Sequence, residues 1–409
     1  MTHGTAFVAT DLAQQIRTRH RIESIDLLRG IVMIIMAIDH IRDFFHYDSY
    51  FFSPTDISQT TPSIFFTRWV THLCAPTFIF LAGVSAYFIR KQNTAEETTL
   101  FLVTRGIWLI VLQFTLVRFV WSFDTTFHYN AHSIISILGL CMIMLAGLIY
   151  LPWKTLLILS VLLIAGHNLL DGVSFQSGSV AEFFWSFLHV NTTYHYGNGY
   201  SFEIFYPLIP WIGVMALGYC VGRLFEQDFS TAYRKKILLR TGMGSLALLF
   251  LLRLSNFYGD PVAWSIQTEW SRTLLSFLNF QKYPPSLFYV GVMLGISFVL
   301  LGIMEGKNLE RWKPVILFGK VALFYYVMHL LVILVFALLT AVLSGLSWQT
   351  MIFTGPIKGG SDLLKGKFGF SIGYVYVVWI VVILFLYPLC AHWKNFKVRN
   401  KRKWWVSYV

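Results

Sequence analysis

Charged residues are scarce in this chain, and that scarcity excludes most classes of soluble protein. Asp, Glu, Lys and Arg make up 13% of the 409 residues, whereas an ordinary soluble domain carries about 25%. Hydrophobic residues make up 56%, and they gather in repeated runs of about 20 residues, the length of a membrane-spanning helix. Alternating segments of about 10 residues, which are typical of membrane β-barrels, are absent. The composition therefore predicts an all-α, polytopic membrane protein.

Cysteine is rare too, and its placement excludes two kinds of site. The chain has four cysteines and no C-x-x-C spacing, so neither a disulfide framework nor a zinc site is expected. Each cysteine lies in or beside an apolar run, as small buried residues do: Cys74, Cys141, Cys220 and Cys390. A removable signal peptide is not expected, because the first apolar run ends in charges rather than in a small-residue cleavage site.

Ten apolar segments are long enough to be predicted as transmembrane helices. They cover 24–45, 73–91, 101–121, 132–150, 153–170, 204–224, 235–255, 285–304, 314–344 and 371–392. The ninth is long for a single span, so we expect it to tilt or to continue beyond the bilayer. The spans define one transmembrane domain, residues 21–392, between a polar N-terminal segment, 1–20, and a basic tail, 393–409.

Basic residues are distributed unevenly between the two sides of this predicted bundle. If the N-terminus is cytoplasmic, most of the 32 Lys and Arg residues fall in inside segments, as the positive-inside rule requires. Both termini are then inside, and the long outside loops are 46–72, 171–203, 256–284 and 345–370. The formal charge of +12 therefore indicates membrane orientation. Anionic lipid is an expected partner of the tail, and nucleic acid is not.

Ionisable residues are concentrated on the first predicted span. On an α-helix, Asp26 and His40 are about 21 Å apart along the axis and within about 40° in direction, and Arg29 shares this stripe. Because ionisable groups at membrane depth usually face a cavity or a partner, we expect the stripe to be functional. A second set at the outer end has helical spacing that permits Asp–Arg pairs: Asp39, Arg42, Asp43 and His46.

The stripe by itself leaves the reaction open. It could line the path of an acyl donor, but a proton- or solute-coupled transporter would also place His and Asp along such a path. A non-catalytic membrane partner is a third possibility, and Arg42 and Asp43 could simply anchor the helix end. His329, inside the ninth span, is either functional or a buried His bonded to Tyr325 or to a neighbouring helix.

Five motifs give the chain a family likeness. "RIESIDLLRGIVMIIMAIDH" at 21–40 resembles the opening motif of membrane acyltransferases, R-x-x-S-[IV]-D-x-x-R-G, and is most similar to that of the heparan-α-glucosaminide N-acetyltransferase-like family. The others follow in the family's order and cover most of the chain: "APTFIFLAGVSAYF" at 75–88, "YPLIPWIGVMALGY" at 206–219, "KYPPSLFY" at 282–289 and "LFYYVMHLLV" at 323–332.

The resemblance implies a multi-pass enzyme that transfers acetyl groups from cytoplasmic acetyl-CoA to an amino sugar on the far side of the membrane. The family's motif Asp falls on Asp26, and an active-site Asn of the human lysosomal relative falls on His40. An acidic residue of that relative falls on His72, and the His of its Y-V-G-H segment falls on His329. The luminal His of the relatives has no equivalent at its usual distance before His72. Pro62 stands at that position, so His46 could take the role only with a shifted loop.

These residues can be given chemical roles. A His can remove a proton from an amine near neutral pH or accept the acetyl group itself, and a carboxylate can orient the imidazole. As catalytic residues we predict His40, His46, His72, Asp26 and Asp39. As contacts of the CoA phosphates we predict Arg29, Arg90, Lys91 and Arg105, and as further candidates His329, Asp43 and Lys282. No metal is expected.

The sequence thus predicts an acetyl-CoA-dependent acyltransferase in a bacterial inner membrane. The expected acceptor is an extracytoplasmic glycan, with an amino group favoured over a hydroxyl. Short outside loops and the absence of a luminal domain favour the bacterial setting over a lysosomal one. Membrane lipid is the other expected partner, and whether the chain forms a homodimer is left open.

Overall fold

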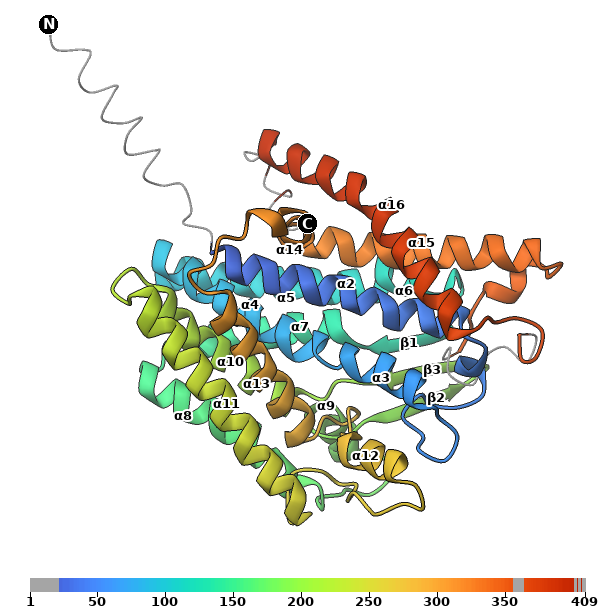
Figure 1. Cartoon of the computed structure of the whole chain (residues 1–409), viewed down its shortest axis with the longest axis horizontal. Helices are drawn as coiled ribbons and strands as arrows, with labels where there is room; N and C mark the ends of the chain where they lie inside the picture. Colours follow the sequence, from blue (N-terminus) through green and yellow to red (C-terminus); the bar gives the residue numbers. More distant parts are fainter. Residues whose placement is uncertain (1–21, 356–363, 401–402, 404–405, 407–409) are drawn as a thin grey trace, which may run out of the picture.

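Helices dominate the structure, a computed structural model that describes residues 22–355, 364–400, 403 and 406. The longer helices (Figure 1) are α2 (Glu23–Phe45), α4 (Cys74–Gln92), α5 (Ala95–Leu112), α7 (Ile134–Leu148), α8 (Trp153–Gly166), α10 (Leu208–Gly222), α11 (Thr231–Ser255), α13 (Leu287–Met304), α15 (Ala322–Leu343) and α16 (Ile372–Arg399). The shorter ones are α3 (Pro62–Thr71), α6 (Arg118–Ser122), α9 (Val180–Leu188), α12 (Trp270–Leu278) and α14 (Lys313–Lys320). The predicted N-terminal segment, 1–20, lies outside the described residues.

The predicted helical membrane bundle is confirmed. Within the described part of the chain, eight helical segments are long and apolar enough to cross a membrane. α7 is apolar but shorter, and α2 is long but carries charges at both ends. With these two, every predicted span is occupied by helix. α16 continues to Arg399, so the predicted basic tail begins as part of the last helix.

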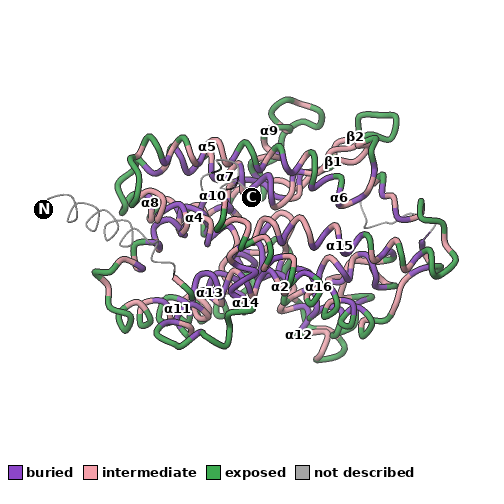
Figure 2. Tube along the Cα trace, turned by 90° about the horizontal axis from the view of Figure 1, so that it is seen from above, coloured by how far each residue is buried: buried purple, intermediate pink, exposed green. Residues whose placement is uncertain are grey.

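The bundle has a central and a peripheral set of helices. In α4 and α10, 72% of the membrane-length window is buried, whereas in α8 and α11 the share is 22%. Buried positions gather where α2, α13 and α14 meet, and exposed positions follow the loops at the edges (Figure 2). α2 is among the central helices and packs against α4, α14, α15 and α16. The ionisable stripe therefore lies inside the protein.

Two glycines bring α2 and α14 into backbone contact. A Cβ added to Gly319 would lie 2.0 Å from the carbonyl oxygen of Asp26, and one added to Gly30 would lie 2.1 Å from that of Val315. Only glycine permits such an approach. The inner end of α2 is therefore fixed against α14, where we call inner and outer the ends predicted to be cytoplasmic and extracytoplasmic.

The predicted ninth span, 314–344, is two helices rather than one, which corrects the expectation of a single long helix. α14 ends at Lys320 and α15 begins at Ala322, with Val321 between them at φ −128° and ψ 38°. Glycine at position 319 and its backbone contact with α2 favour a break at this point. The break lets α14 follow the inner end of α2 while α15 packs along its outer part.

The outer side holds more structure than the predicted loops. Loop 46–72 contains α3, which continues almost directly into α4. A small sheet, which the sequence did not predict, joins β1 (Tyr129–His132), β2 (Thr192–Gly197) and β3 (Tyr200–Ile204) in the order β1-β3-β2. β3 runs parallel to β1 and antiparallel to β2. The sheet ties the segment after α6 to the segment before α10.

The chain after α2 is also joined to the segment that precedes α16. The backbone N–H of Tyr47 donates to the carbonyl oxygen of Phe370 over 3.1 Å, and the N–H of Phe370 donates to the carbonyl oxygen of Phe45 over 2.8 Å. These two bonds hold the outer end of α2 beside the start of the last helix.

Candidate functional site

His40 and His329 meet at the outer part of α2. Nδ1 of His40 lies 2.7 Å from Nε2 of His329 on α15, and the two rings stack with centroids 4.9 Å apart. Trp121 packs edge-on against His40, also at 4.9 Å between centroids. His329 is fully buried, whereas His40 keeps partial exposure. Two residues predicted separately as candidates thus form one pair.

The hydrogen bonds fix the proton positions in this pair. Nδ1 of His329 lies 3.1 Å from the carbonyl oxygen of Tyr325, and because a carbonyl only accepts, this nitrogen carries the proton. Nε2 of His329 is then the acceptor, so Nδ1 of His40 donates to it. Nε2 of His40 is left with a lone pair and has no hydrogen-bond partner among the described residues. This nitrogen is the one that can act as a base.

Asp39 does not orient an imidazole, although the sequence predicted that it could. Its oxygens face two guanidinium groups instead: Arg42 at 2.7 Å, as the helical spacing predicts, and Arg68 on α3. Arg42 also pairs with Asp43 at 2.6 Å. Asp39, Arg42 and Arg68 are all buried, so the three form a compact ionic group. The partner that orients His40 is His329.

His72 lies at the junction of α3 and α4, buried and edge-on to Tyr289 with 5.2 Å between ring centroids. Lys282, in the loop before α13, is partly buried and acts electrostatically on His72, His40 and Asp39. The structure therefore places Lys282 within the electrostatic reach of both histidines. No contact between His72 and His40 is found in the described ranges, so the two do not form a second pair.

His46 has a structural contact rather than a contact with His40. Its Nδ1 accepts a hydrogen bond from the backbone N–H of Asp48 over 3.2 Å, at the start of the 3₁₀ turn Tyr47–Tyr50. Burial lowers the pKa of His46, which favours the neutral ring that this bond requires. Across the described part of the chain, no three His, Cys, Asp or Glu side chains are grouped to hold a metal ion.

Arg29, predicted to contact CoA, joins three helices at the inner end. Its guanidinium pairs with Asp26 at 3.1 Å and donates to the carbonyl oxygen of Gly319 over 3.3 Å and to Oγ of Ser85 over 3.1 Å. The stripe of α2 therefore faces α4 and α14 at this end and α15 at the other. These contacts hold the guanidinium within the protein.

The other three predicted CoA contacts belong to α4 and α5. Arg90 donates to the carbonyl oxygen of Asn93 over 3.0 Å, and Lys91 pairs with Glu226 at 3.1 Å while 55% of its side chain stays exposed. Arg105 lies partly buried in α5. Lys91 is thus the one whose charge is placed to meet a ligand in solution.

Glu305 is a site residue that the sequence did not single out. It is 5% exposed, accepts a hydrogen bond from Oγ of Ser24 over 2.6 Å and pairs with Nε of Arg234 at 2.5 Å. The available signal was an acidic residue directly after the apolar run of α13. Glu305 links the start of α2 to α11 and α13.

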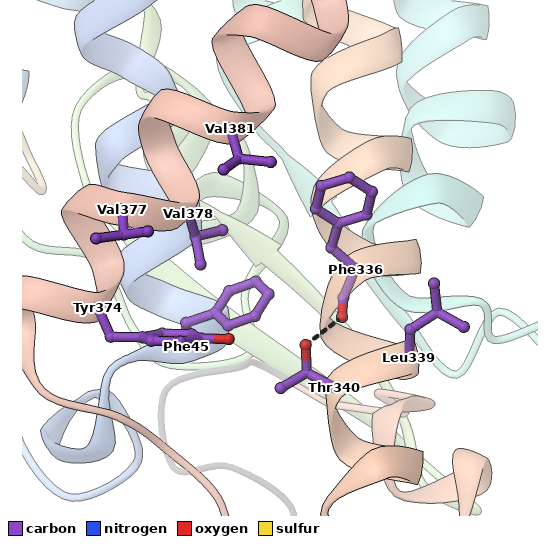
Figure 3. A pocket seen from close by; sticks show the side chains of 8 residues that line it. All are labelled: Phe45, Phe336, Leu339, Thr340, Tyr374, Val377, Val378 and Val381. Atoms are coloured by element: carbon purple, nitrogen blue, oxygen red, sulfur yellow. Dashed lines mark hydrogen bonds between the residues drawn. The ribbon is translucent and has the colours of Figure 1, made fainter.

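An apolar groove of about 300 Å³ lies beside the outer end of α2, between α15 and α16 (Figure 3). Phe45, Phe336, Tyr374 and three valines of α16 line it. The hydroxyl of Thr340, which lies at one edge, donates to the carbonyl oxygen of Phe336 over 2.7 Å. The groove suits a hydrocarbon chain of the bilayer and offers no group for the chemistry of a polar substrate.

Residues 21–254 match a family model described as "Heparan-alpha-glucosaminide N-acetyltransferase, catalytic". The matched range covers more than half of the chain and includes α2, α3 and α4, with His40 and His72. His329 and Lys282 lie beyond it. A search of curated proteins gave no match.

Proposed function

Because this chain belongs to the heparan-α-glucosaminide N-acetyltransferase family, we propose that it transfers acetyl from cytoplasmic acetyl-CoA to a sugar outside the membrane. The favoured acceptor is the amino group of a glucosamine-type glycan, with a hydroxyl as the second choice. The membrane is the inner membrane of a bacterium.

His40 is the general base of the proposed reaction. Its free Nε2 takes a proton from the acceptor amine as the amine nitrogen attacks the thioester carbonyl carbon. The carbon–sulfur bond then breaks, and the CoA thiolate recovers the proton from the imidazolium. One C–N bond forms for the C–S bond that is lost, and no oxidant or metal takes part.

The single observation that carries this proposal is the pair of His40 and His329. It leaves a neutral imidazole with a defined basic nitrogen in the interior of a membrane helix bundle. Because the imidazole of His40 is held in one tautomer, it can accept a proton without first rotating or changing its tautomer. Ionisable residues retained at membrane depth are functional by default.

The proposed donor enters from the inner end of α2. Asp26 and His40 are fourteen helical steps apart, about 21 Å along the axis, so the acetyl end of the donor must move into the bundle to meet the base. Lys91, near the inner ends of α4 and α10, is the favoured contact of the CoA phosphates because its ammonium is exposed.

The test is the release of CoA thiol by purified protein given acetyl-CoA, with and without glucosamine. We expect acceptor-stimulated release, abolished in His40→Ala and retained in His195→Ala, which removes an exposed histidine of β2. Normal release by His40→Ala would remove His40 from the chemistry. Solute uptake that requires a proton gradient and no acetyl-CoA would instead support a transporter.

A further inference from the structure

A second set of buried polar side chains comes from elements other than α2. We call it the donor cluster, after its hydrogen-bond donors and not after the acetyl donor. It consists of His72 at the junction of α3 and α4, Trp211 on α10, Lys282 in the loop before α13, and Tyr289 on α13. Except for Lys282, which is partly buried, each is at most 1% exposed. None of the four has a step in the proposed transfer reaction.

Ring contacts make the donor cluster continuous. The centroids of His72 and Tyr289 are 5.2 Å apart, and those of Tyr289 and Trp211 are 6.1 Å apart. The charge of Lys282 reaches the His72 ring electrostatically. Its Nζ also lies 5.3 Å from the ring centroid of Tyr283. Three helices and one loop thus bring these side chains to one place.

Three atoms of the donor cluster are buried without a hydrogen-bond partner in the described ranges: Nδ1 of His72, Nε1 of Trp211 and the hydroxyl of Tyr289. Burying such groups unpaired destabilises a fold, and native proteins keep few of them. Three such atoms on successive neighbouring rings indicate that something outside the chain completes their hydrogen bonds. A ligand that binds from the outer side would complete them.

The chemistry of these groups indicates what the ligand carries. An indole N–H and an ammonium can only donate, and a phenol readily donates. Lys282 has no ion pair among the described residues, whereas the nearby carboxylate of Asp39 is engaged by Arg42 and Arg68. The cluster therefore presents donors and one uncompensated positive charge, which match an anionic oxygen group.

We propose that the donor cluster binds a carboxylate or phosphate carried by the acceptor, so that anionic amino sugars are preferred to neutral ones. The acceptor role rests on the proposed acetyl transfer, but the anion site does not. Because the charge of Lys282 reaches both His40 and His72, an anion held there would lie within electrostatic reach of the base. The amine of the same sugar would then be directed toward Nε2 of His40.

Binding is measured first, without acetyl-CoA, by calorimetric titration of purified protein. The probes are glucosamine, muramic acid, which adds a carboxylate, and glucosamine 6-phosphate. We expect at least one anionic sugar to bind at least about tenfold more tightly than glucosamine, the effect of one charge-assisted hydrogen bond. The tighter of the two anionic probes identifies the group. Equal dissociation constants for the three sugars would overturn the proposal.

Lys282→Met should abolish the preference for the anionic sugar and leave glucosamine binding unchanged, and Lys282→Arg should retain the preference. Lys367→Met, which removes an exposed cation from another outer loop, is the matched control. If Lys282→Met weakens the binding of all three sugars equally, the ammonium of Lys282 does not recognise an anion and the proposal fails.

Tyr289→Phe separates a binding role from a structural one. Because its hydroxyl is unpaired, its loss should leave the thermal unfolding temperature unchanged or raise it, while anionic sugar binds several-fold more weakly. A lower unfolding temperature with unchanged binding would make the hydroxyl structural and contradict the proposal. A protein that binds the anionic sugar but never releases CoA would disprove the acetyl transfer and keep the anion site.

Discussion

The two ends of α2 both carry buried charge, but they satisfy it differently. At the inner end, Arg29 contacts Asp26, Ser85 and Gly319, and Glu305 holds Ser24 and Arg234. At the outer end, the ionic group is joined by ion pairs but leaves Nε of Arg42 without a hydrogen bond, and Nε2 of His40 and the three buried atoms of the donor cluster find no partner in the described residues.

This difference distinguishes polar groups that stabilise the fold from polar groups that are available to a ligand. Polar groups that pair within the protein join helices, and a ligand that replaced those bonds would gain little. Groups buried with open bonds reduce stability until a ligand arrives. We therefore expect substitutions at the inner end to affect mainly folding, and those at His40 and in the donor cluster to affect mainly binding and turnover.

The largest expected effect is a loss of stability, and it tests the ionic group at the outer end of α2. Asp39→Asn should destabilise the protein by about 3–5 kcal/mol, because it leaves the buried guanidiniums of Arg42 and Arg68 uncompensated. Thermal unfolding in detergent measures the effect. Asp43→Asn is the control: its side chain is 23% exposed, so a loss below about 1 kcal/mol is expected. Equal losses would contradict the ionic group.

The next effect tests whether His329 positions the base. His329→Ala should lower kcat about 100-fold, at the low end of what general base catalysis contributes, and leave KM for the acceptor unchanged. His329→Gln should restore part of the activity, since its amide oxygen can accept the bond from Nδ1 of His40. If Gln and Ala behave alike, His329 serves only to fill space.

A smaller effect is expected at Glu305, on the inner side. Glu305→Gln should destabilise the protein by about 1.5–3 kcal/mol, because its hydrogen bonds involve charged groups, while kcat of the folded protein stays unchanged. Glu310→Gln, whose side chain is 63% exposed beside Lys313, should change neither. A fall in kcat without a loss of stability would show that the inner end takes part in turnover.

The smallest effect concerns Lys91. Lys91→Ala should cost less than about 1 kcal/mol of stability, because its pair with Glu226 is exposed. If the ammonium meets a CoA phosphate, KM for acetyl-CoA rises about fivefold, which corresponds to about 1 kcal/mol. The rise should shrink as salt is added. A KM equal to that of the wild type would remove Lys91 from the donor site.

Short-range patterns in the sequence predicted much of this arrangement. Apolar runs placed the spans, and helical spacing predicted both the stripe and the pair of Asp39 with Arg42. What the patterns missed is long-range. Nothing near His40 indicates that its partner lies 289 positions away, and an apolar run does not reveal a break at Val321. The sheet was missed because its short strands lie in aromatic loops without clear alternation.

Trp211 and Tyr289 were missed for a related reason. In an apolar span, an aromatic residue usually fills space, and its polar atom becomes informative only when the neighbours are known. Lys282 was noted, but the sequence could not show that Asp39 is already engaged by two arginines. The excess of hydrogen-bond donors over acceptors in the cluster arises only when the helices assemble, and no single sequence motif reveals it.

The two backbone bonds between Phe370 and the end of α2 bear on how a ribosome delivers this protein. α2 is made well before Glu305, His329 and Phe370, the residues that engage its two ends. A nascent α2 can pair Asp26 with Arg29 and Asp39 with Arg42 within the helix, but it lacks its contacts with α13, α15 and α16 until they are made. A chain that ends early therefore carries an intact α2 whose two ends lack the neighbours that complete their contacts.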